Sequence, residues 1–303
     1  MLIHAMKHLL SIRELSVEAI AQILRGSTKI KAERGRHATQ PLQGQSWALI
    51  FSKSSTRTRV SFEVGVRELG GDVMFLSAND IQLGRGEPIK DTARVLGRMI
   101  HGAIIRTFAQ RDVEEFAEFS KIRTINALTD DEHPCQILTD IFTIQEKLGP
   151  IQGKVVTFVG DAACNVPISW ILAAGKLGFE LRLAAPKKYQ PAPDVLKPAG
   201  GKVIVTEDLK SAARGADALY TDVFVSMGKE AESAERLAEL KDYQINSHVV
   251  QLAKPGALVM HCLPAYRGKE ITDETFERHA QTIFDQAENR LHVQKAILEW
   301  IVS

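Results

Sequence analysis

The sequence has little cysteine and almost no imbalance of charge. Its three cysteines, at positions 135, 164 and 262, are too few for a disulfide framework, and an odd number of them cannot all be paired. The 38 Lys and Arg side chains nearly cancel the 37 Asp and Glu side chains. Because no global field favours a polyanion, neither nucleic acid nor an acidic membrane surface is an expected partner. Any anion site must therefore be local.

Long apolar runs and glycine-rich nucleotide motifs are also absent. No stretch approaches the roughly 18 apolar residues of a membrane span, and His4, Lys7 and His8 interrupt the apolar N-terminus, which disfavours a signal peptide. We therefore expect a cytoplasmic protein without a membrane partner. No G-x-G-x-x-G follows a predicted strand, and the frame of a Walker loop is missing, which disfavours dinucleotide and P-loop sites.

Apolar runs do alternate with helical patterns along the chain. The runs at 47–51, 103–106, 155–160, 218–222 and 257–260 are typical of strands in parallel sheets covered on both faces. Ser16 is a predicted N-cap of an early helix. Residues 134–148 are predicted to form a helix that Gly149 and Pro150 end, and we place a domain boundary there.

The sequence thus predicts an α/β protein with two doubly wound parallel-sheet domains linked by helices. The predicted domains are residues 1–148 and 149–285, a division that the length of 303 residues supports. Residues 286–303 carry an apolar stripe at helical spacing. We expect this segment to form a C-terminal helix that packs back on the N-terminal domain.

A turn rich in hydroxyls and arginine follows the strand at 47–51, with the sequence Ser55-Thr56-Arg57-Thr58-Arg59, and leads into a helix. Unpaired N–H groups and the helix dipole favour an anion at a helix N-terminus. Arg57 adds a planar guanidinium that matches phosphate oxygens. The alternative is that the hydroxyls only cap the helix and the arginines only face solvent. The density of both residue types favours phosphate binding.

Further polar clusters follow the other strands or open the next helix. These clusters are 133–136 (His-Pro-Cys-Gln), 160–165 (Gly-Asp-Ala-Ala-Cys-Asn), 222–228 (Asp-Val-Phe-Val-Ser-Met-Gly) and 261–264 (His-Cys-Leu-Pro). In open α/β sheets ligands bind outside the carboxyl ends of the strands, so we expect these clusters to line one cleft. For a single His or Asp, the alternative is a loop residue with a purely structural role.

A zinc site is a competing interpretation of the same clusters. Enough nitrogen and sulfur ligands are supplied by His133, Cys135, Cys164, His261 and Cys262. No pair among them has the close C-x₂-C or H-x₃-H spacing that structural zinc sites favour, which argues against this interpretation.

Together these motifs resemble those of the ornithine carbamoyltransferase family. Residues 51–63 resemble the family's carbamoyl phosphate signature, 133–136 its second carbamoyl phosphate motif, and 82–87 (Gln-Leu-Gly-Arg-Gly-Glu) its mobile loop. Asp222 with 226–228 resembles the ornithine loop, 261–264 the motif beside the ornithine side chain, and 287–290 the last active-site segment. The match runs in order over nearly the whole chain.

The resemblance implies transfer of the carbamoyl group of carbamoyl phosphate to the side-chain amine of L-ornithine, giving L-citrulline and phosphate, with no metal or organic cofactor. It implies a phosphate site made by Ser55, Thr56, Arg57 and Thr58, and a carbamoyl site made by Arg106, His133, Gln136 and Arg290. Gln82 would reach carbamoyl phosphate from a neighbouring subunit, which implies a homotrimer. Assembly beyond the trimer stays open.

For ornithine, the resemblance implies contacts from Asn165, Asp222, Ser226 and Met227, with Cys262 and Leu263 beside the reacting amine and carbamoyl group. The catalytic roles fall to Arg57, Arg106, His133 and Cys262. The family usually has two consecutive Asn where this chain has Cys164-Asn165, so the shape of that loop is open. The acceptor of the amine proton, Cys262 or the departing phosphate, is also open, as is a biosynthetic or catabolic role. The alternatives are a putrescine- or lysine-using transferase and a non-catalytic binding protein.

Overall fold

The structure, a computed structural model, describes residues 6–78, 80–82 and 86–303. The chain divides into two compact units: unit 1, Met1–Thr139 with Asn289–Ser303, and unit 2, Asp140–Glu288. One division falls within helix α5 (Pro134–Leu148) and the other within helix α12 (Ala280–Val302). The boundary predicted at residues 148 and 149 corresponds to the C-terminal end of α5. Among the described residues, no helix combines the length and apolar character needed to cross a membrane.

Unit 1 contains a parallel sheet in the order β2-β1-β3-β4. Its strands are β1 (Ser46–Phe51), β2 (Asp72–Ser77), β3 (Gly102–Arg106) and β4 (Arg123–Leu128). Phe51 is in register with Ser77 on one side and with Arg106 on the other, and Arg106 is in register with Leu128. The carboxyl ends of the strands therefore meet at one edge, where α/β proteins place their ligands.

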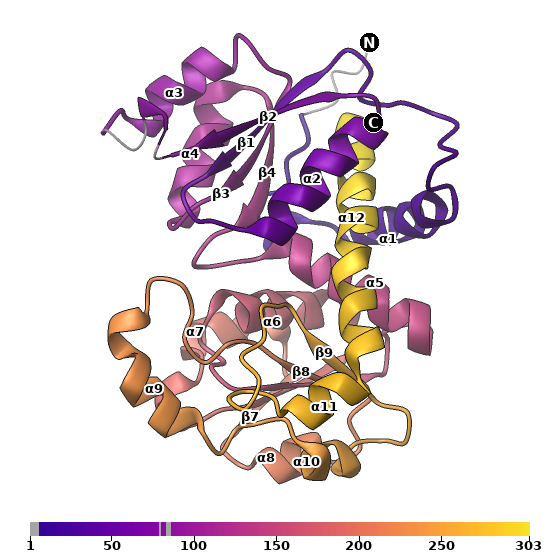
Figure 1. Ribbon diagram of the computed structural model, residues 1–303, viewed down its shortest axis with the longest axis vertical. Helices are drawn as coiled ribbons and strands as arrows, with labels where there is room; N and C mark the ends of the chain where they lie inside the picture. The colour runs from indigo at the N-terminus through magenta and orange to yellow at the C-terminus, as the bar shows by residue number, and fades with distance from the viewer. Residues whose placement is uncertain (1–5, 79, 83–85) are drawn as a thin grey trace. The chain divides into compact units, whose positions relative to one another are not determined.

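Helices cover both faces of this sheet (Figure 1). On one face α3 (Ile89–Leu96) and α4 (Gln110–Ser120) pack Ala93 and Phe116 against Ile105. On the other face lie α1 (Val17–Ala32), α2 (Thr56–Glu68) and the C-terminal part of α12. Gly65 lets α2 approach α12 closely, since a Cβ at this position would lie 3.2 Å from Cγ of Lys295. A short 3-10 turn, η1 (Ile12–Glu14), precedes α1.

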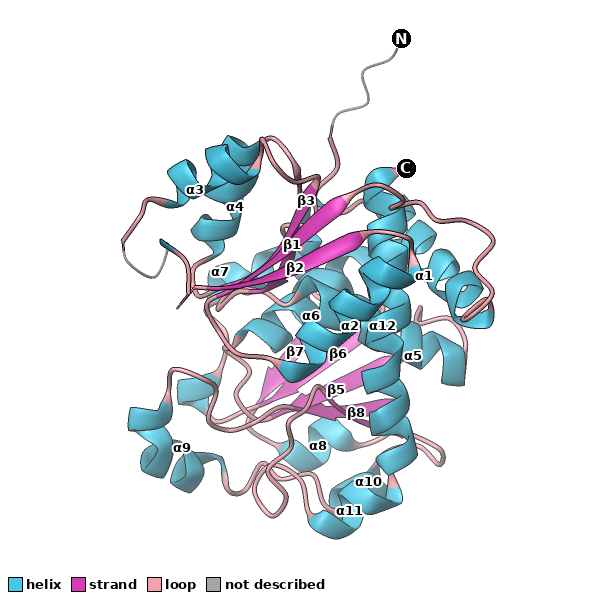
Figure 2. Cartoon of the chain, turned by 45° about the horizontal axis from the view of Figure 1, so that its top comes forward, coloured by secondary structure: helices cyan, strands magenta, loops and turns pink. Residues whose placement is uncertain are grey.

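Unit 2 contains a second parallel sheet, in the order β7-β6-β5-β8-β9. One face packs against α8 (Leu209–Ala213), α10 (Ser247–Leu252) and α11 (Asp273–Arg278), and α6 (Asn165–Leu177) covers the other (Figure 2). On the α6 face the ring of Trp170 meets the ring of Tyr220 edge-on at 5.7 Å. The strands are β5 (Val155–Val159), β6 (Glu180–Ala184), β7 (Val203–Thr206), β8 (Ala218–Thr221) and β9 (Leu258–His261). Shorter elements are α7 (Pro193–Leu196), α9 (Ser233–Leu240), η3 (Lys187–Tyr189), η4 (Lys197–Ala199) and η5 (Glu230–Glu232).

The predicted α/β class with two parallel sheets is confirmed. Ser16 caps α1 through the Ala19 N–H, and α5 has the predicted bounds. The C-terminal helix begins at Ala280 rather than at residue 286, because Ile283 is already buried in the core of unit 2. As expected, its C-terminal part packs back on the N-terminal domain, where Gly26 of α1 and Gly65 of α2 face it.

A buried ion pair holds α2 to α12 within unit 1. The ammonium of Lys295, which is fully buried, bonds to the carboxylate of Glu68 at the end of α2 and lies 2.9 Å from Nε2 of His37. Burial lowers the pKa of Lys295, and the carboxylate of Glu68 opposes that shift. Breaking one partner of a buried pair strands the other charge in a medium of low polarity.

Replacing Glu68 tests how much this ion pair contributes to the free energy of unfolding. Glu68→Gln should lower the free energy of unfolding by about 3 kcal/mol, because Lys295 keeps its charge without a carboxylate beside it. The double variant Glu68→Gln/Lys295→Met should recover most of that loss, since no stranded charge remains. Urea unfolding measures both, and losses that simply add in the double variant would contradict the pairing.

Candidate functional site

The turn after β1 forms an anion-binding geometry at the start of α2. Ser55 is the N-cap, and its hydroxyl accepts a hydrogen bond from the Thr58 N–H at 3.3 Å. The first-turn N–H groups of a helix otherwise have no partner within the helix. Thr56 is exposed, Arg57 is half-buried, and Thr58 is buried. One hydroxyl thus caps the helix, as the simpler alternative requires, while an arginine and further donors are available for an anion.

A buried guanidinium joins this turn to the start of α5. Arg290 of α12, only 3% exposed, donates from Nη2 to the hydroxyl oxygen of Thr58 at 2.7 Å and from Nη1 to Oε1 of Gln136. Gln136 lies in the first turn of α5 and is buried. Because Thr58 accepts from Arg290, its own hydroxyl proton can point toward a ligand. Arg290, Thr58 and Gln136 therefore form one connected hydrogen-bond network in unit 1.

His133 and Arg106 complete this polar cluster. Arg106 is the last residue of β3 and His133 immediately precedes α5; both are buried. Burial, and then the positive charges of Arg290 and Arg106, lower the pKa of His133 well below its ordinary value. His133 is therefore a neutral imidazole at neutral pH, which can donate or accept a hydrogen bond but brings no charge.

Lys53 and Gln82 bond to groups other than those of this polar cluster. Lys53, within the turn itself, is buried, pairs with the carboxylate of Asp130 and lies 4.3 Å over the ring of Phe108. It therefore anchors the loops that follow β1 and β4. Gln82 is exposed, and its carbonyl accepts a hydrogen bond from the Glu87 N–H at 3.2 Å. The predicted mobile loop continues through residues 83–85, which lie outside the described residues.

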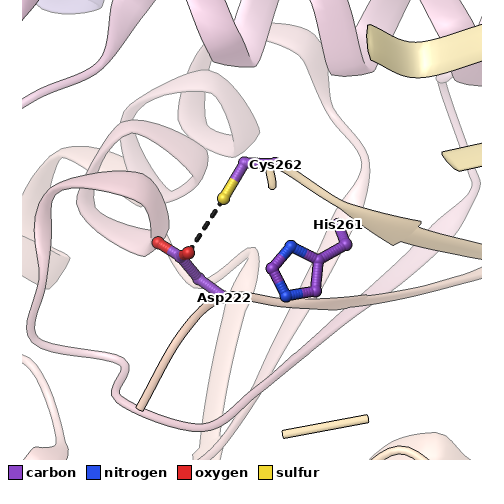
Figure 3. A group of neighbouring side chains, drawn as sticks. All are labelled: Asp222, His261 and Cys262. Carbon is purple, nitrogen blue, oxygen red and sulfur yellow. Dashed lines mark hydrogen bonds between the residues drawn. The ribbon is translucent and has the colours of Figure 1, made fainter. Parts of the chain in front are cut away.

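In unit 2, Asp222 and Cys262 face each other at the ends of neighbouring strands (Figure 3). Asp222 follows β8, Cys262 follows β9, and the preceding residues Thr221 and His261 are in register. The Cys262 thiol donates to Oδ1 of Asp222 at 2.9 Å, and the Val223 N–H donates to the same oxygen at 2.7 Å. Burial, and then the adjacent Asp222 carboxylate, raise the pKa of Cys262 well above its ordinary value. Cys262 is thus a hydrogen-bond donor.

His261, the residue before Cys262, is fully buried, and its ring is hydrogen-bonded on both sides. Its Nδ1 accepts the Leu263 N–H at 2.9 Å, so the proton sits on Nε2, which faces Oε1 of Glu270 at 3.1 Å. Leu263 has a left-handed backbone with φ of 59°. The ligand atoms of Asp222, His261 and Cys262 lie within 4.8 Å of one another. Both ring nitrogens and the thiol are already hydrogen-bonded, so this donor set does not suit a zinc ion without rearrangement.

The remaining predicted residues lie on two loops of the same unit. Asn165 is the first residue of α6, and Cys164 is the residue before it. The Cys164 thiol donates to the Asp161 carbonyl at 3.2 Å. Ser226 and Met227 lie on the loop between β8 and α9, and Met227 is 47% exposed. The structure places all of these at the carboxyl edge of the second sheet. That these loops and the cluster at 133–136 line a single cleft stays a prediction.

Arg236 of α9 is a residue that the sequence did not single out. It is buried and donates to Oδ2 of Asp161 at 2.7 Å and to the Phe224 carbonyl at 3.3 Å. It therefore ties the loop after β8 to the loop after β5. Arg236 follows Glu232 at helical spacing and also pairs with it at 2.9 Å. That spacing is typical of a surface ion pair, so it gives no signal of burial.

The thiol groups provide a direct test of these electrostatics. Burial raises the pKa of Cys135 to about 12, and the pKa values of Cys164 and Cys262 are also raised, so all three thiols should stay protonated up to about pH 9. The ultraviolet absorbance of thiolate during alkaline titration measures this. Asp222→Asn should lower the pKa of Cys262, because a neighbouring negative charge is removed. A wild-type thiolate that forms near neutral pH and disappears in Cys262→Ser would contradict the structure.

Comparison with known proteins matches two consecutive stretches of the chain to described domain types. Residues 7–146 match the model of the aspartate/ornithine carbamoyltransferase carbamoyl-P binding domain, and residues 152–301 match that of the aspartate/ornithine carbamoyltransferase Asp/Orn binding domain. The chain is 56% identical to an ornithine carbamoyltransferase of Akkermansia muciniphila, with 97% of both chains covered. It is 47% identical to one from a Sulfurovum species, with 98% of this chain and 99% of the relative covered.

Solved structures show the same similarity. The anabolic ornithine carbamoyltransferase of Campylobacter jejuni superposes with a TM-score of 0.92 at 41% identity, covering 98% of this chain and 99% of that chain. The ornithine carbamoyltransferase of Pyrococcus furiosus superposes with a TM-score of 0.91 at 43% identity, covering 97% and 96%.

Proposed function

The chain belongs to the aspartate/ornithine carbamoyltransferase family, and we propose that the two polar clusters are its carbamoyl phosphate and ornithine sites. The enzyme transfers the carbamoyl group of carbamoyl phosphate to the side-chain amine of L-ornithine, giving L-citrulline and phosphate. One observation carries the assignment of the first site. The Arg290 network ends on the hydroxyl-capped N-terminus of α2, inside the domain that matches the carbamoyl phosphate-binding model.

The phosphate group is held by the N-terminus of α2. Thr56 supplies N–H and hydroxyl donors, and Arg57 supplies a planar cation. Thr58 lies beside the phosphate with its N–H bonded to Ser55, which shapes the turn as the N-cap. These contacts suit a doubly charged phosphate, because the helix dipole and the guanidinium both favour negative charge. They hold the leaving group in the ground state and stabilise the charge that it gains as the bond breaks.

The carbamoyl oxygen is polarised by Arg106, His133 and Thr58. A neutral His133 donates a hydrogen bond without acting as a competing acid, and Arg106 supplies the positive charge. Each such donor aimed at a developing oxyanion contributes on the order of 3 kcal/mol to transition-state stability. Gln136 and Arg290 fix Thr58 and contact the carbamoyl end from the same side.

The ornithine amine must lose a proton before it attacks. Freeing the electron pair of an alkylammonium at physiological pH costs roughly 4 kcal/mol. Asp222 attracts the ammonium groups of ornithine, with Asn165, Ser226 and Met227 contacting the rest of the amino acid. The Cys262 thiol already donates to Asp222 and has a raised pKa, so it orients that carboxylate rather than accepting the proton.

The departing phosphate is the acceptor that this arrangement favours for the proton that the nitrogen loses after it has attacked. The ammonium first gives one proton to solvent. The free amine nitrogen then forms a bond to the carbamoyl carbon, the bond from that carbon to the bridging oxygen breaks, and the second proton of the nitrogen leaves with the phosphate. The turn at Cys262 and Leu263 lies beside the reacting atoms in this proposal. No step requires a metal or an organic cofactor, since the acyl group is already activated by its phosphate.

Removal of Arg57 tests the phosphate site. Arg57→Gln should lower kcat/KM for carbamoyl phosphate by about 100-fold or more, because a guanidinium on the leaving phosphate is lost. Arg67→Gln is the matched control, since Arg67 lies on the same helix with an exposed side chain. Citrulline formation measures both variants. Equal activities for Arg57→Gln and Arg67→Gln would contradict the assignment.

We also propose a homotrimer in which Gln82 serves a neighbouring subunit, and a cytoplasmic location. The exposed position of Gln82 supports the first proposal. Inactive Arg57→Gln and Gln82→Ala proteins should regain part of the activity when they are dissociated and reassembled together, because mixed trimers then contain complete sites. Assembly is followed by light scattering. Reassembled mixtures that form trimers but stay inactive would contradict a shared site.

A further inference from the structure

Gln286 of α12 links three parts of unit 2 through one buried amide. Its Oε1 accepts the backbone N–H of His261 at 3.0 Å, and its Nε2 donates to Oδ1 of Asp140 at 2.6 Å. The hydroxyl of Tyr220 lies 3.4 Å from the same Nε2. Gln286 and Asp140 are both fully buried. The chemistry described above uses neither side chain.

The contact with His261 gives a hydrogen-bond acceptor to a backbone N–H on an edge strand. β9 is the last strand in the order, so N–H groups that point away from β8 have no strand to bond. A buried N–H without a partner is costly, and Gln286 supplies the acceptor at the last residue of β9. The next residue is Cys262, whose thiol bonds to Asp222. Gln286 therefore fixes the backbone immediately before the residue that orients the proposed ammonium-binding carboxylate.

The anchor of Gln286 lies on the helix that also carries the carbamoyl phosphate motif. Asp140 follows Gln136 by one turn of α5, and Gln286 precedes Arg290 by one turn of α12. In unit 1, Arg290 bonds to Gln136; in unit 2, Gln286 bonds to Asp140. The same two helices thus carry one hydrogen-bonded pair that serves the carbamoyl phosphate residues and another that serves the ornithine residues.

We propose that Gln286, anchored by Asp140, is a positioning residue for the ornithine side of the reaction. It holds the His261 peptide, and thereby the Cys262 thiol and the Asp222 carboxylate, in the geometry that receives the amine. This role rests on the proposed function of Asp222 and Cys262. A residue with only a structural role would affect the stability of the fold and the use of both substrates alike.

The first test compares two identical substitutions on α12. Gln286→Met removes the three hydrogen bonds of the amide with little change in volume, whereas Gln281→Met alters an exposed side chain of the same helix. Gln286→Met should raise the KM for ornithine about tenfold, because the His261 N–H loses its acceptor and the Cys262 turn shifts. The KM for carbamoyl phosphate should be unchanged, and Gln281→Met should behave as the wild type.

The second test reverses the polarity of the pair. Gln286→Glu places a carboxylate against Asp140, and like charges at hydrogen-bond distance repel, so the KM for ornithine should rise. In the double variant Asp140→Asn/Gln286→Glu, the Asn amide can donate to one Glu oxygen while the other accepts the His261 N–H. The double variant should therefore bind ornithine better than the Gln286→Glu single variant, which a loss of packing alone does not predict.

The outcomes separate this inference from the proposed function. An unchanged ornithine KM in Gln286→Met, or equal rises for both substrates, would overturn the positioning role. If Gln286→Met does not fold, the polarity reversal decides, and a double variant no better than Gln286→Glu would also overturn it. A wild-type enzyme that forms no citrulline would instead count against the proposed function itself.

Discussion

The proposed carbamoyl phosphate site depends above all on one buried guanidinium, that of Arg290. It joins the helix that presents the phosphate donors, through Thr58, to the helix that presents His133 and Gln136. Burying a cation is costly unless polar groups surround it, and the oxygens of Thr58 and Gln136 are among the partners of this one. Arg106 adds a second buried cation, and burial together with the two charges lowers the pKa of His133 and keeps its imidazole neutral. Two buried guanidinium groups beside a helix N-terminus favour a phosphorylated anion, which supports the proposed assignment.

The proposed ornithine site has the opposite charge, because a carboxylate lies at its centre. Asp222 accepts hydrogen bonds from the Cys262 thiol and the Val223 N–H, which fix one carboxylate oxygen without neutralising the charge. Burial and then the same carboxylate raise the pKa of the Cys262 thiol, which makes Cys262 poorly suited to act as a base at neutral pH. His261, Glu270 and Gln286 hold the strand end on which this arrangement rests. The positive charges of Arg106 and Arg290 match the negative charge of carbamoyl phosphate, and the carboxylate of Asp222 matches the positive charge of ornithine.

The sequence predicted much of this because apolar strands and the polar residues that follow them are local features. It missed β2, β4, β6 and β7; β2 and β7 are edge strands with partly exposed side chains, and polar residues interrupt β4 and β6. The buried partners were also unpredictable. Lys295, Arg236 and Gln286 resemble the solvent-facing residues of amphipathic helices, and their partners Glu68, Asp161 and Asp140 lie far away in the sequence. The predicted site roles stay predictions until ligands are seen bound.

A crystal structure with phosphonoacetamide, in which a methylene replaces the bridging oxygen of carbamoyl phosphate, tests the central claim most directly. The account predicts the phosphonate at the N-terminus of α2, beside Thr56, Arg57 and Thr58, and the amide oxygen toward Arg106 and His133. A phosphonate bound instead at the N-terminus of α6, on the Cys164–Asn165 turn, would contradict it. So would an analogue that binds with its amide at the α2 turn and its phosphonate away from Arg57.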